Sequence, residues 1–271
     1  MKKTLLTTCI LTVLALPAFA TPPGTFINGG FETDSTNTST GPTGWTLHSG
    51  QWGYNNTGVT DLYQGLSTVI TDPAATDPYS NGALRKVLSG SNSYQLNDYT
   101  NDYHFSTLSQ TVTAYSGSNL YLAFSAVMQN PGHPVGENPH FAFSIFDQTT
   151  STSLYSVAFD SLGAGAPGIN WNLGSGDWKY TDWSVIHVDT TGLIGHDLTV
   201  QVEAYDCAQG GHGGYAYVDA FSPDAPVPNA GVGPINYLEA NTLDQIPEPS
   251  SFVLVGVGAA ALAFLRRRAS K

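Results

Sequence analysis

Several segments in the middle of the chain alternate apolar and polar residues with a period of two. Residues 119–129 are the longest of them, and residues 140–147 and 198–204 repeat the pattern. In residues 119–129 one face carries Leu120, Leu122, Phe124, Ala126 and Met128. Alternation with this period is typical of strands that bury one face. We therefore expect strands, and almost no helix, between residues 21 and 240.

Short polar segments separate these strands and indicate how they pair. Residues 105–114 and 119–129 are joined by Tyr115-Ser116-Gly117-Ser118, which predicts a hairpin. Residues 140–147 and 153–160 are expected to form a second hairpin. The regular spacing of short strands predicts an all-β fold, an antiparallel jelly-roll β-sandwich with one buried face per sheet.

The two ends of the chain differ from this middle part. Residues 1–20 combine Lys2 and Lys3, an apolar stretch and the sequence Pro-Ala-Phe-Ala, which together predict a helical signal peptide cleaved after Ala20. An uncleaved membrane anchor is the alternative, but the apolar stretch is short for a span. We place the β-sandwich domain at residues 21–222 and a Pro/Gly-rich linker at residues 223–245.

The last residues combine two prolines, an apolar segment and a basic end. Pro247 and Pro249 flank Glu248 and keep the backbone extended. A hydrophobic helix is expected at residues 250–265, and the basic tail at residues 266–271 follows it. That tail includes Arg266, Arg267 and Arg268. Arginines at this position are expected to stay on the cytoplasmic side of the inner membrane.

Residues 246–271 resemble the PEP-CTERM sorting signal of Gram-negative bacteria. The resemblance rests on the Pro-Glu-Pro tripeptide, the glycine-containing apolar segment and the terminal arginines, in that order. It implies an exosortase as partner, transient anchoring in the inner membrane, and delivery to the cell surface or extracellular matrix. An ordinary C-terminal membrane anchor is the alternative, and it leaves the tripeptide unexplained.

Charge and cysteine content narrow the possibilities further. Between residues 21 and 248, three basic and twenty-one acidic residues give a net charge of −18. Such a surface repels nucleic acid, so we expect no nucleic-acid partner. Cys9 leaves with the signal peptide and Cys207 remains alone, so no internal disulfide is expected.

Two segments at opposite ends of the domain resemble the galactose-binding-like jelly roll of carbohydrate-binding modules. They are Asn28-Gly29-Gly30-Phe31-Glu32 and the tyrosine-rich run of residues 213–221. Members often hold a structural Ca²⁺ between their terminal strands, which implies Glu32 and Asp219 as calcium ligands. The family often has Asp where Gly30 stands. The alternative is that both carboxylates only form hydrogen bonds at strand ends.

Tryptophans offer a possible sugar-binding platform. Trp171 and Trp178 flank the glycine-rich residues 172–177, and we expect a stacking surface there if the domain binds saccharide. The alternative is that they fill the core, as most tryptophans of a sandwich do.

No catalytic residues are assigned, and we expect no enzyme. Cys207 and His212 are close in sequence, but the intervening glycines leave their relative direction open. His133, Glu137 and His140 lie in a proline-rich segment that excludes a metalloprotease helix, and a solvated loop is favoured. An acid pair for glycoside hydrolysis stays possible among the acidic residues.

The sequence therefore predicts an exported, noncatalytic surface protein associated with extracellular polysaccharide, exopolysaccharide or biofilm matrix. One alternative is a carbohydrate-binding module with a defined saccharide ligand. Another is a secreted glycoside hydrolase or lyase.

Overall fold

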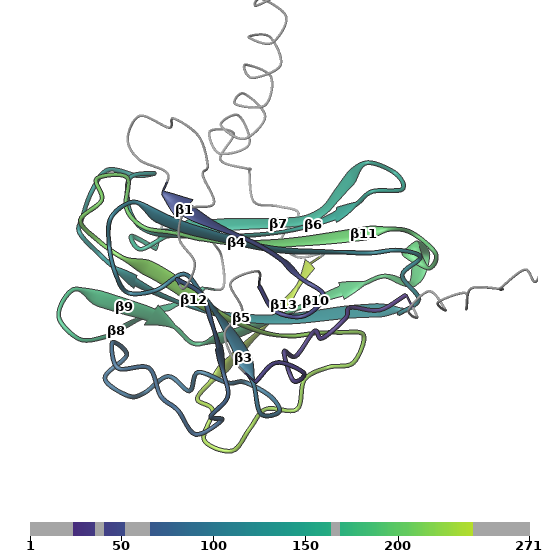
Figure 1. The fold of residues 1–271 in the computed structure, drawn as a ribbon, viewed down its shortest axis with the longest axis horizontal. Helices are drawn as coiled ribbons and strands as arrows, with labels where there is room; N and C mark the ends of the chain where they lie inside the picture. Colours follow the sequence, from purple (N-terminus) through teal and green to yellow (C-terminus); the bar gives the residue numbers. More distant parts are fainter. Residues whose placement is uncertain (1–23, 36–40, 52–65, 164–168, 241–271) are drawn as a thin grey trace, which may run out of the picture.

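A computed structural model describes residues 24–35, 41–51, 66–163 and 169–240 of the 271-residue chain. The expected terminal helices, at residues 1–20 and 250–265, lie outside these ranges. Two sheets stack face to face and form a β-sandwich, as predicted (Figure 1). Strands whose alternate residues are apolar bury that face between the two layers. One short 3₁₀ helix, η1, spans Thr191–Leu193.

The first sheet has five strands in the order β1-β4-β11-β6-β7, and all its pairs are antiparallel. Its strands are β1 (Thr46–Gln51), β4 (His104–Val112), β11 (Leu198–Tyr205), β6 (His140–Asp147) and β7 (Thr152–Asp160). The predicted hairpin between residues 140–147 and 153–160 is confirmed by the pairing of β6 with β7.

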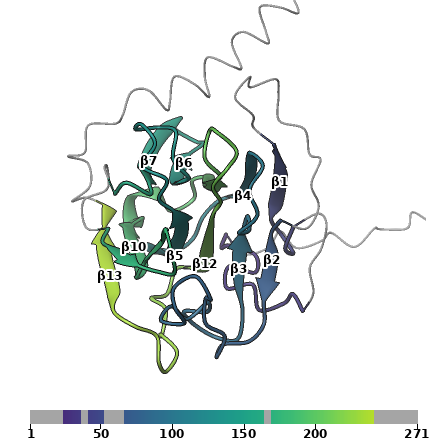
Figure 2. The same ribbon diagram turned by 90° about the vertical axis from the view of Figure 1, so that its left-hand side faces the viewer.

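The second sheet has eight strands, of which six follow the order β13-β10-β5-β12-β3-β2 (Figure 2). These are β13 (Ile235–Glu239), β10 (Trp183–Asp189), β5 (Asn119–Gln129), β12 (Gly214–Ser222), β3 (Ser93–Leu96) and β2 (Thr68–Ile70). β9 (Trp178–Thr181) pairs with the end of β5 and with β8 (Trp171–Leu173).

The core between the sheets contains the residues that the alternating pattern selects. All five apolar residues of β5 named above lie in it. Phe141, Phe143 and Ile145 of β6 meet them from the other sheet, together with the apolar residues of β11. The ring centroids of Phe124 and Phe141 lie 4.7 Å apart, so the two layers are in direct contact at this point.

The predicted hairpin between residues 105–114 and 119–129 is wrong. β4 belongs to the five-stranded sheet and β5 to the eight-stranded sheet, so the chain crosses between layers at Tyr115. The ring of Tyr115 is fully buried, and its hydroxyl donates to the Asn119 carbonyl. Its backbone N–H donates to the His196 carbonyl at 2.7 Å. A large side chain that fills the space between the layers favours a crossover over a tight turn.

The expectation of one buried face per sheet fails for the eight-stranded sheet. Its outer face carries a second apolar cluster that includes Leu88, Trp183 and Tyr217. Fully buried Asp77 accepts hydrogen bonds there from the hydroxyls of Tyr215, at 2.5 Å, and Tyr217, at 2.8 Å. The loop that carries Asp77 therefore covers this face and supplies a partner for both buried hydroxyls.

The segment predicted as a linker contributes a strand to the sandwich. β13 pairs in parallel with β10, with Trp183 opposite Ile235 and His187 opposite Glu239. Residues 223–234 lead to it, and Pro228 forms a bridge with Ser89. The β domain thus extends to residue 240 rather than ending at residue 222. Backbone pairing with an edge strand does not need alternating apolar residues, so the pattern did not reveal β13.

Candidate functional site

Glu32 and Asp219 face each other across Gly30. A Cβ atom added at Gly30 would lie 3.9 Å from both Glu32 Oε1 and Asp219 Oδ1. Asp219 comes from β12, and Glu32 from the loop that precedes β1. The structure thus brings together two carboxylates that are 187 positions apart in the chain.

Both carboxylates already accept backbone hydrogen bonds. Asp219 Oδ2 accepts from the N–H groups of Leu88 and Ser89, at 3.1 and 3.0 Å. Glu32 Oε1 accepts from Ser91, at 2.9 Å. Burial raises the pKa of Asp219 well above its usual range, and the nearby charge of Glu32 adds to this rise. A cation between the two groups would offset that cost, and oxygen donors suit Ca²⁺.

The predicted tryptophan platform is not formed as expected. Trp178 is only 7% exposed, and it stacks on Tyr79 with ring centroids 4.3 Å apart. Trp171 is half-buried and packs edge-on against Phe159 of the core. Trp178 therefore serves the second apolar cluster and does not offer an open face to a sugar ring.

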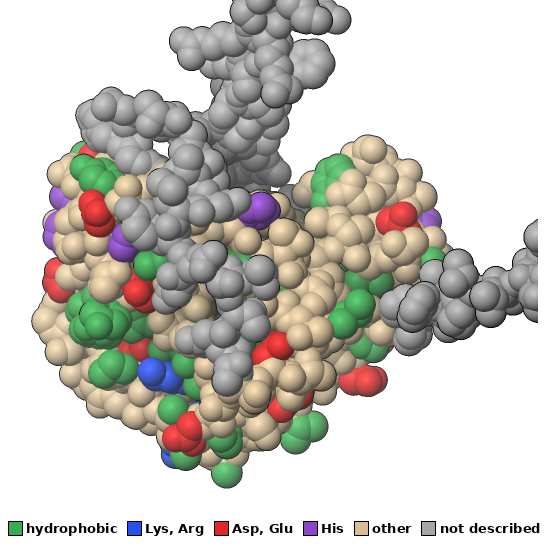
Figure 3. All heavy atoms as spheres, in the orientation of Figure 1, with side chains coloured by type: hydrophobic (Ala, Val, Ile, Leu, Met, Phe, Trp, Pro, Cys, Tyr) green, Lys and Arg blue, Asp and Glu red, His purple; other side chains and the backbone are tan. Residues whose placement is uncertain are grey.

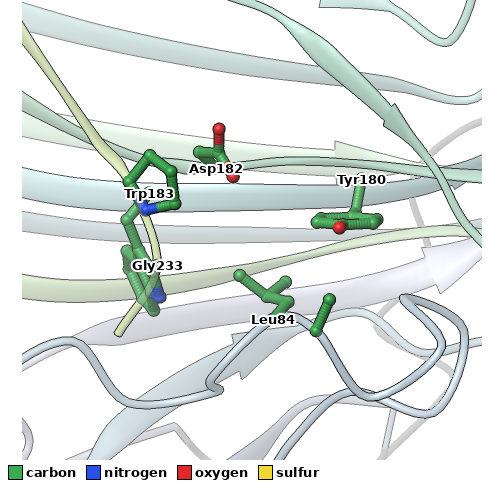
Figure 4. A pocket seen from close by; sticks show the side chains of 7 residues that line it. Leu84, Tyr180, Asp182, Trp183 and Gly233 are labelled. Carbon is green, nitrogen blue, oxygen red and sulfur yellow. The ribbon is translucent and has the colours of Figure 1, made fainter. Parts of the chain in front are cut away.

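A small pocket lies beside the second apolar cluster, at the junction of β9 and β10 (Figure 4). Its volume is about 100 Å³, and Tyr180, Asp182 and Trp183 line it together with Leu84 and Gly233. Burial raises the pKa of Asp182, while a hydrogen bond from Asn172 at 3.0 Å lowers it. Ligand sites usually enclose roughly 300–1,000 Å³, so this pocket is small for a saccharide.

The outer side of the five-stranded sheet is rich in hydroxyl and amide groups. Because the core residues of β11 point inward, the residues that alternate with them point outward. The pairing register places outward residues of β4 and β6 beside them. We call the polar residues of this surface the polar face; Ala142 and Phe146 lie among them on the same side of the sheet. The polar face comprises Thr107, Ser109, Thr111, Ser144, Thr199, Gln201 and Glu203.

Hydrogen bonds connect the polar face to an aromatic row at one end of the sheet. Glu203 accepts from the Gln201 amide, and from the Tyr205 hydroxyl at 3.1 Å. Tyr205 is stacked between Phe105, at 5.6 Å, and His140, at 4.4 Å. Burial, followed by the Glu203 carboxylate, raises the pKa of Tyr205, so its hydroxyl stays protonated. Sugar hydroxyls both donate and accept hydrogen bonds, and such a surface offers partners of both kinds.

Three side chains of types that can bind metal ions meet at the end of the sandwich where β5 ends and β12 begins. His133 Nε2 lies 3.3 Å from His212 Nδ1, and Cys207 Sγ lies 3.5 Å from the same Nδ1 atom. Burial, and then neighbouring His133, lower the pKa of His212. The structure thus settles the direction of His212 relative to Cys207, and it places both residues beside the proline-rich loop.

Glu137 and His140, the other two candidates from the proline-rich segment, do not join this cluster. His140 begins β6 and stacks on Tyr205, and Glu137 accepts a hydrogen bond from Gln209 at 2.8 Å. Sequence reasoning missed the convergence of His133 with Cys207 and His212. No local pattern in the sequence marks this convergence. It follows from the antiparallel pairing of β5 with β12, in which Gly214 lies opposite Met128, because this pairing brings the two flanking loops to the same sheet end.

Residues 245–268 match the PEP-CTERM protein-sorting motif. The sorting signal predicted from the Pro-Glu-Pro tripeptide is therefore confirmed. Its residues lie beyond the described ranges, so its conformation is not described. Within those ranges no helix is long and apolar enough to cross a membrane.

Several solved structures of carbohydrate-binding modules are similar to this chain. TmCBM61 in complex with beta-1,4-galactotriose matches 73% of this chain and 96% of its own, with a TM-score of 0.38 and 14% identity. The structure titled "CBM4 structure and function" matches 76% of this chain and 100% of its own, with a TM-score of 0.30 and 15% identity.

A third structure comes from a study of the promiscuous specificity of carbohydrate-binding modules of the β-sandwich superfamily. It matches 74% of this chain and 62% of its own, with a TM-score of 0.34 and 12% identity. A search of curated protein sequences found no significant match.

Proposed function

We propose that the protein is exported, processed by an exosortase at residues 245–268, and delivered to the outer surface or extracellular matrix. The match of these residues to the sorting motif carries the proposal. Residues 252–265 contain no charge and, as a helix, extend roughly 21 Å, which is enough to engage the bilayer before processing. The processing enzyme recognises Glu248 together with the proline on each side of it.

Mass spectrometry of surface material tests this sorting step. We expect the protein recovered outside the cell to lack residues 252–271. Replacing Pro247 and Pro249 with alanine should retain the full tail and leave the protein in the inner membrane. Pro226→Ala, a proline outside the motif, is the matched control and should be processed normally. Surface material that still contains Phe252 to Lys271 would overturn the proposal.

In that location we propose a noncatalytic role in which the polar face binds extracellular polysaccharide of an exopolysaccharide or biofilm matrix. Its hydroxyl and amide groups support this role, as does its low charge, since Glu203 is the one ionisable residue among the seven. An open hydrogen-bonding surface on one side of a sheet suits an extended, uncharged polymer better than a small ligand that needs an enclosing pocket.

Affinity electrophoresis in gels that contain single polysaccharides tests this binding. We expect saturable retention on at least one polymer, and Gln201→Ala should weaken it several-fold, as the loss of about 1 kcal/mol of hydrogen bonding predicts. Gln95→Ala, on β3 of the other sheet, is the control and should leave retention unchanged. Equal retention of the two variants would exclude the polar face, and turnover of the polymer would contradict the noncatalytic role.

We further propose that Glu32 and Asp219 hold a structural Ca²⁺. Their closeness around Gly30 and the raised pKa of Asp219 support this assignment. Bound calcium would link the segment before β1 to β12 and stabilise the terminal strands. These two carboxylates, with nearby backbone carbonyls, would supply the oxygen ligands.

A further inference from the structure

The side chains of His133, Cys207 and His212 place three metal-ligand atoms within 4.8 Å of one another. Cys207 is fully buried, and both histidines are partly exposed. The two contributing loops are residues 130–139, the β5–β6 loop, and residues 206–213, the β11–β12 loop. This cluster is separate from the calcium candidates and from the sorting motif.

Hydrogen bonds hold the β5–β6 loop in the shape that presents His133. The buried Asn138 side chain accepts from the His133 N–H at 3.0 Å and donates to the carbonyls of His133 and Pro134, both at 3.0 Å. The Ala208 N–H donates to the Glu137 carbonyl at 3.0 Å and joins this loop to the β11–β12 loop.

Hydrogen bonds within the β11–β12 loop hold Cys207 and His212 close together. The Cys207 N–H donates to the His212 carbonyl at 2.9 Å, so the two residues lie side by side at the base of the loop. The Gly210 N–H donates to the Cys207 carbonyl at 3.0 Å. These hydrogen bonds hold the backbone of all three residues in place, which is one part of the preorganisation that a binding site requires.

At most one of the two contacts of His212 Nδ1 can be a full two-centre hydrogen bond. His212 Nδ1 faces both His133 Nε2, at 3.3 Å, and Cys207 Sγ, at 3.5 Å. A neutral ring nitrogen either donates its one proton or accepts through one lone pair. A single cation, in contrast, can accept electron pairs from both nitrogens and from a thiolate.

Two of the three separations between these atoms match those around a tetrahedral zinc ion. With Zn–N near about 2.05 Å and Zn–S near about 2.3 Å, tetrahedral ligands lie about 3.3 Å apart for two nitrogens and about 3.5 Å apart for nitrogen and sulfur. The separations of His212 Nδ1 from His133 Nε2 and from Cys207 Sγ are 3.3 and 3.5 Å, and His133 Nε2 and Cys207 Sγ lie within 4.8 Å of each other, so they must approach slightly when the ion binds. Imidazole with thiolate is a donor set for zinc and related transition metals rather than for calcium or magnesium.

We propose that His133 Nε2, Cys207 Sγ and His212 Nδ1 bind one Zn²⁺, with water at the fourth position. The Cys207 thiol releases its proton to solvent on binding. The ion cross-links the β5–β6 and β11–β12 loops in a domain that contains a single cysteine. The water-bearing position leaves zinc accessible to an additional ligand atom.

Calorimetric titration of the metal-free full chain with Zn²⁺ tests the site. We expect one zinc bound per chain and a melting temperature raised by several degrees. Cys207→Ser and His212→Gln should each weaken binding by at least about 100-fold, the upper end of the cost of losing a supporting group around a metal. His187→Gln, on β10, is the matched control and should bind zinc as the parent protein does.

Cobalt substitution of the unaltered protein keeps the test independent of variant folding. Co²⁺ at this site should show thiolate-to-cobalt charge-transfer absorption in the near ultraviolet and strong tetrahedral bands in the visible range. Zinc should abolish both signals, and an excess of calcium should not. Absence of the thiolate band, or zinc binding that survives in a folded Cys207→Ser variant, would overturn the proposal.

Discussion

Gly30 occupies the position between two carboxylates at which the galactose-binding-like pattern often carries Asp. An aspartate Cβ at this position would meet Glu32 Cγ at 3.6 Å and the two carboxylate oxygens at 3.9 Å, all ordinary contacts. The calcium site predicted from sequence therefore has room for a third acidic ligand. At the residue scale, this single position sets how many carboxylates face the proposed ion.

Calcium removal and two substitutions test the calcium site. EGTA, which binds calcium and also zinc, should lower the melting temperature by several degrees, since an ion held at 100 times its Kd adds about 2.7 kcal/mol; calcium added afterwards, and not zinc, should restore the part lost at this site. Asp219→Ala should abolish that response, and Gly30→Asp should raise calcium affinity. Exposed Asp224→Ala is the control. No response to EGTA in the parent protein would favour the alternative, in which Glu32 and Asp219 act only through hydrogen bonds.

At the scale of elements, β13 shows that a proline- and glycine-rich segment can still complete a sheet. Its partner β10 has buried residues on both faces, including Trp183, Val185 and Ile186. Val232 and Ile235 pack against the second apolar cluster, and Leu238 packs against the main core. Without β13 the edge of β10 would be unpaired and these apolar contacts would be lost.

Truncation measures this contribution. A chain that ends after Ser222 should lose a few kcal/mol in the free energy of unfolding, because Val232, Ile235 and Leu238 are partly buried and full burial of one such side chain contributes about 1.5–3 kcal/mol. A chain that ends after Ala240 is the control and should keep the parent stability. Urea unfolding of both chains provides the comparison. Equal stabilities would restore the linker interpretation of residues 223–240.

At the scale of the whole molecule, the surface is acidic, and basic side chains are few on the face shown in Figure 3. Histidines are then the groups whose charge changes most near neutral pH. Burial lowers the pKa of His140 to about 4, partly offset by a backbone hydrogen bond with Asn138. The neutral ring stacked on Tyr205 is therefore the form that the folded state favours.

Stability should consequently fall in acid. The unfolded chain takes up the His140 proton near its ordinary pKa of about 6.5, while the folded chain resists until about pH 4. The stability that comes from the neutral His140 ring is therefore fully present above pH 6.5, and it is lost as the pH falls toward 4. His140→Phe keeps the stacking and should flatten the pH dependence of the melting temperature in this window. An unchanged slope in the variant would contradict the assignment.

Much of the fold could be predicted because strand alternation is local. In β5, β6 and β11 the apolar residues alternate with a period of two, and the residues selected in this way lie in the core. The hairpin of β6 with β7 could be predicted because only a short segment joins the two strands. The crossover at Tyr115 could not be predicted in this way. A short polar connection is compatible with either a turn or a crossover, and the packing of a distant ring decides between them.

By itself, the sequence determined the β-sandwich class and the sorting signal, because both depend on residues that are neighbours in the chain. Only the tertiary structure decided that β13 belongs to the sheet, that Trp178 is buried, and that His133 joins Cys207 and His212. Each of these outcomes depends on segments far apart in the sequence. Their contact follows from which strands pair and which faces remain to be covered.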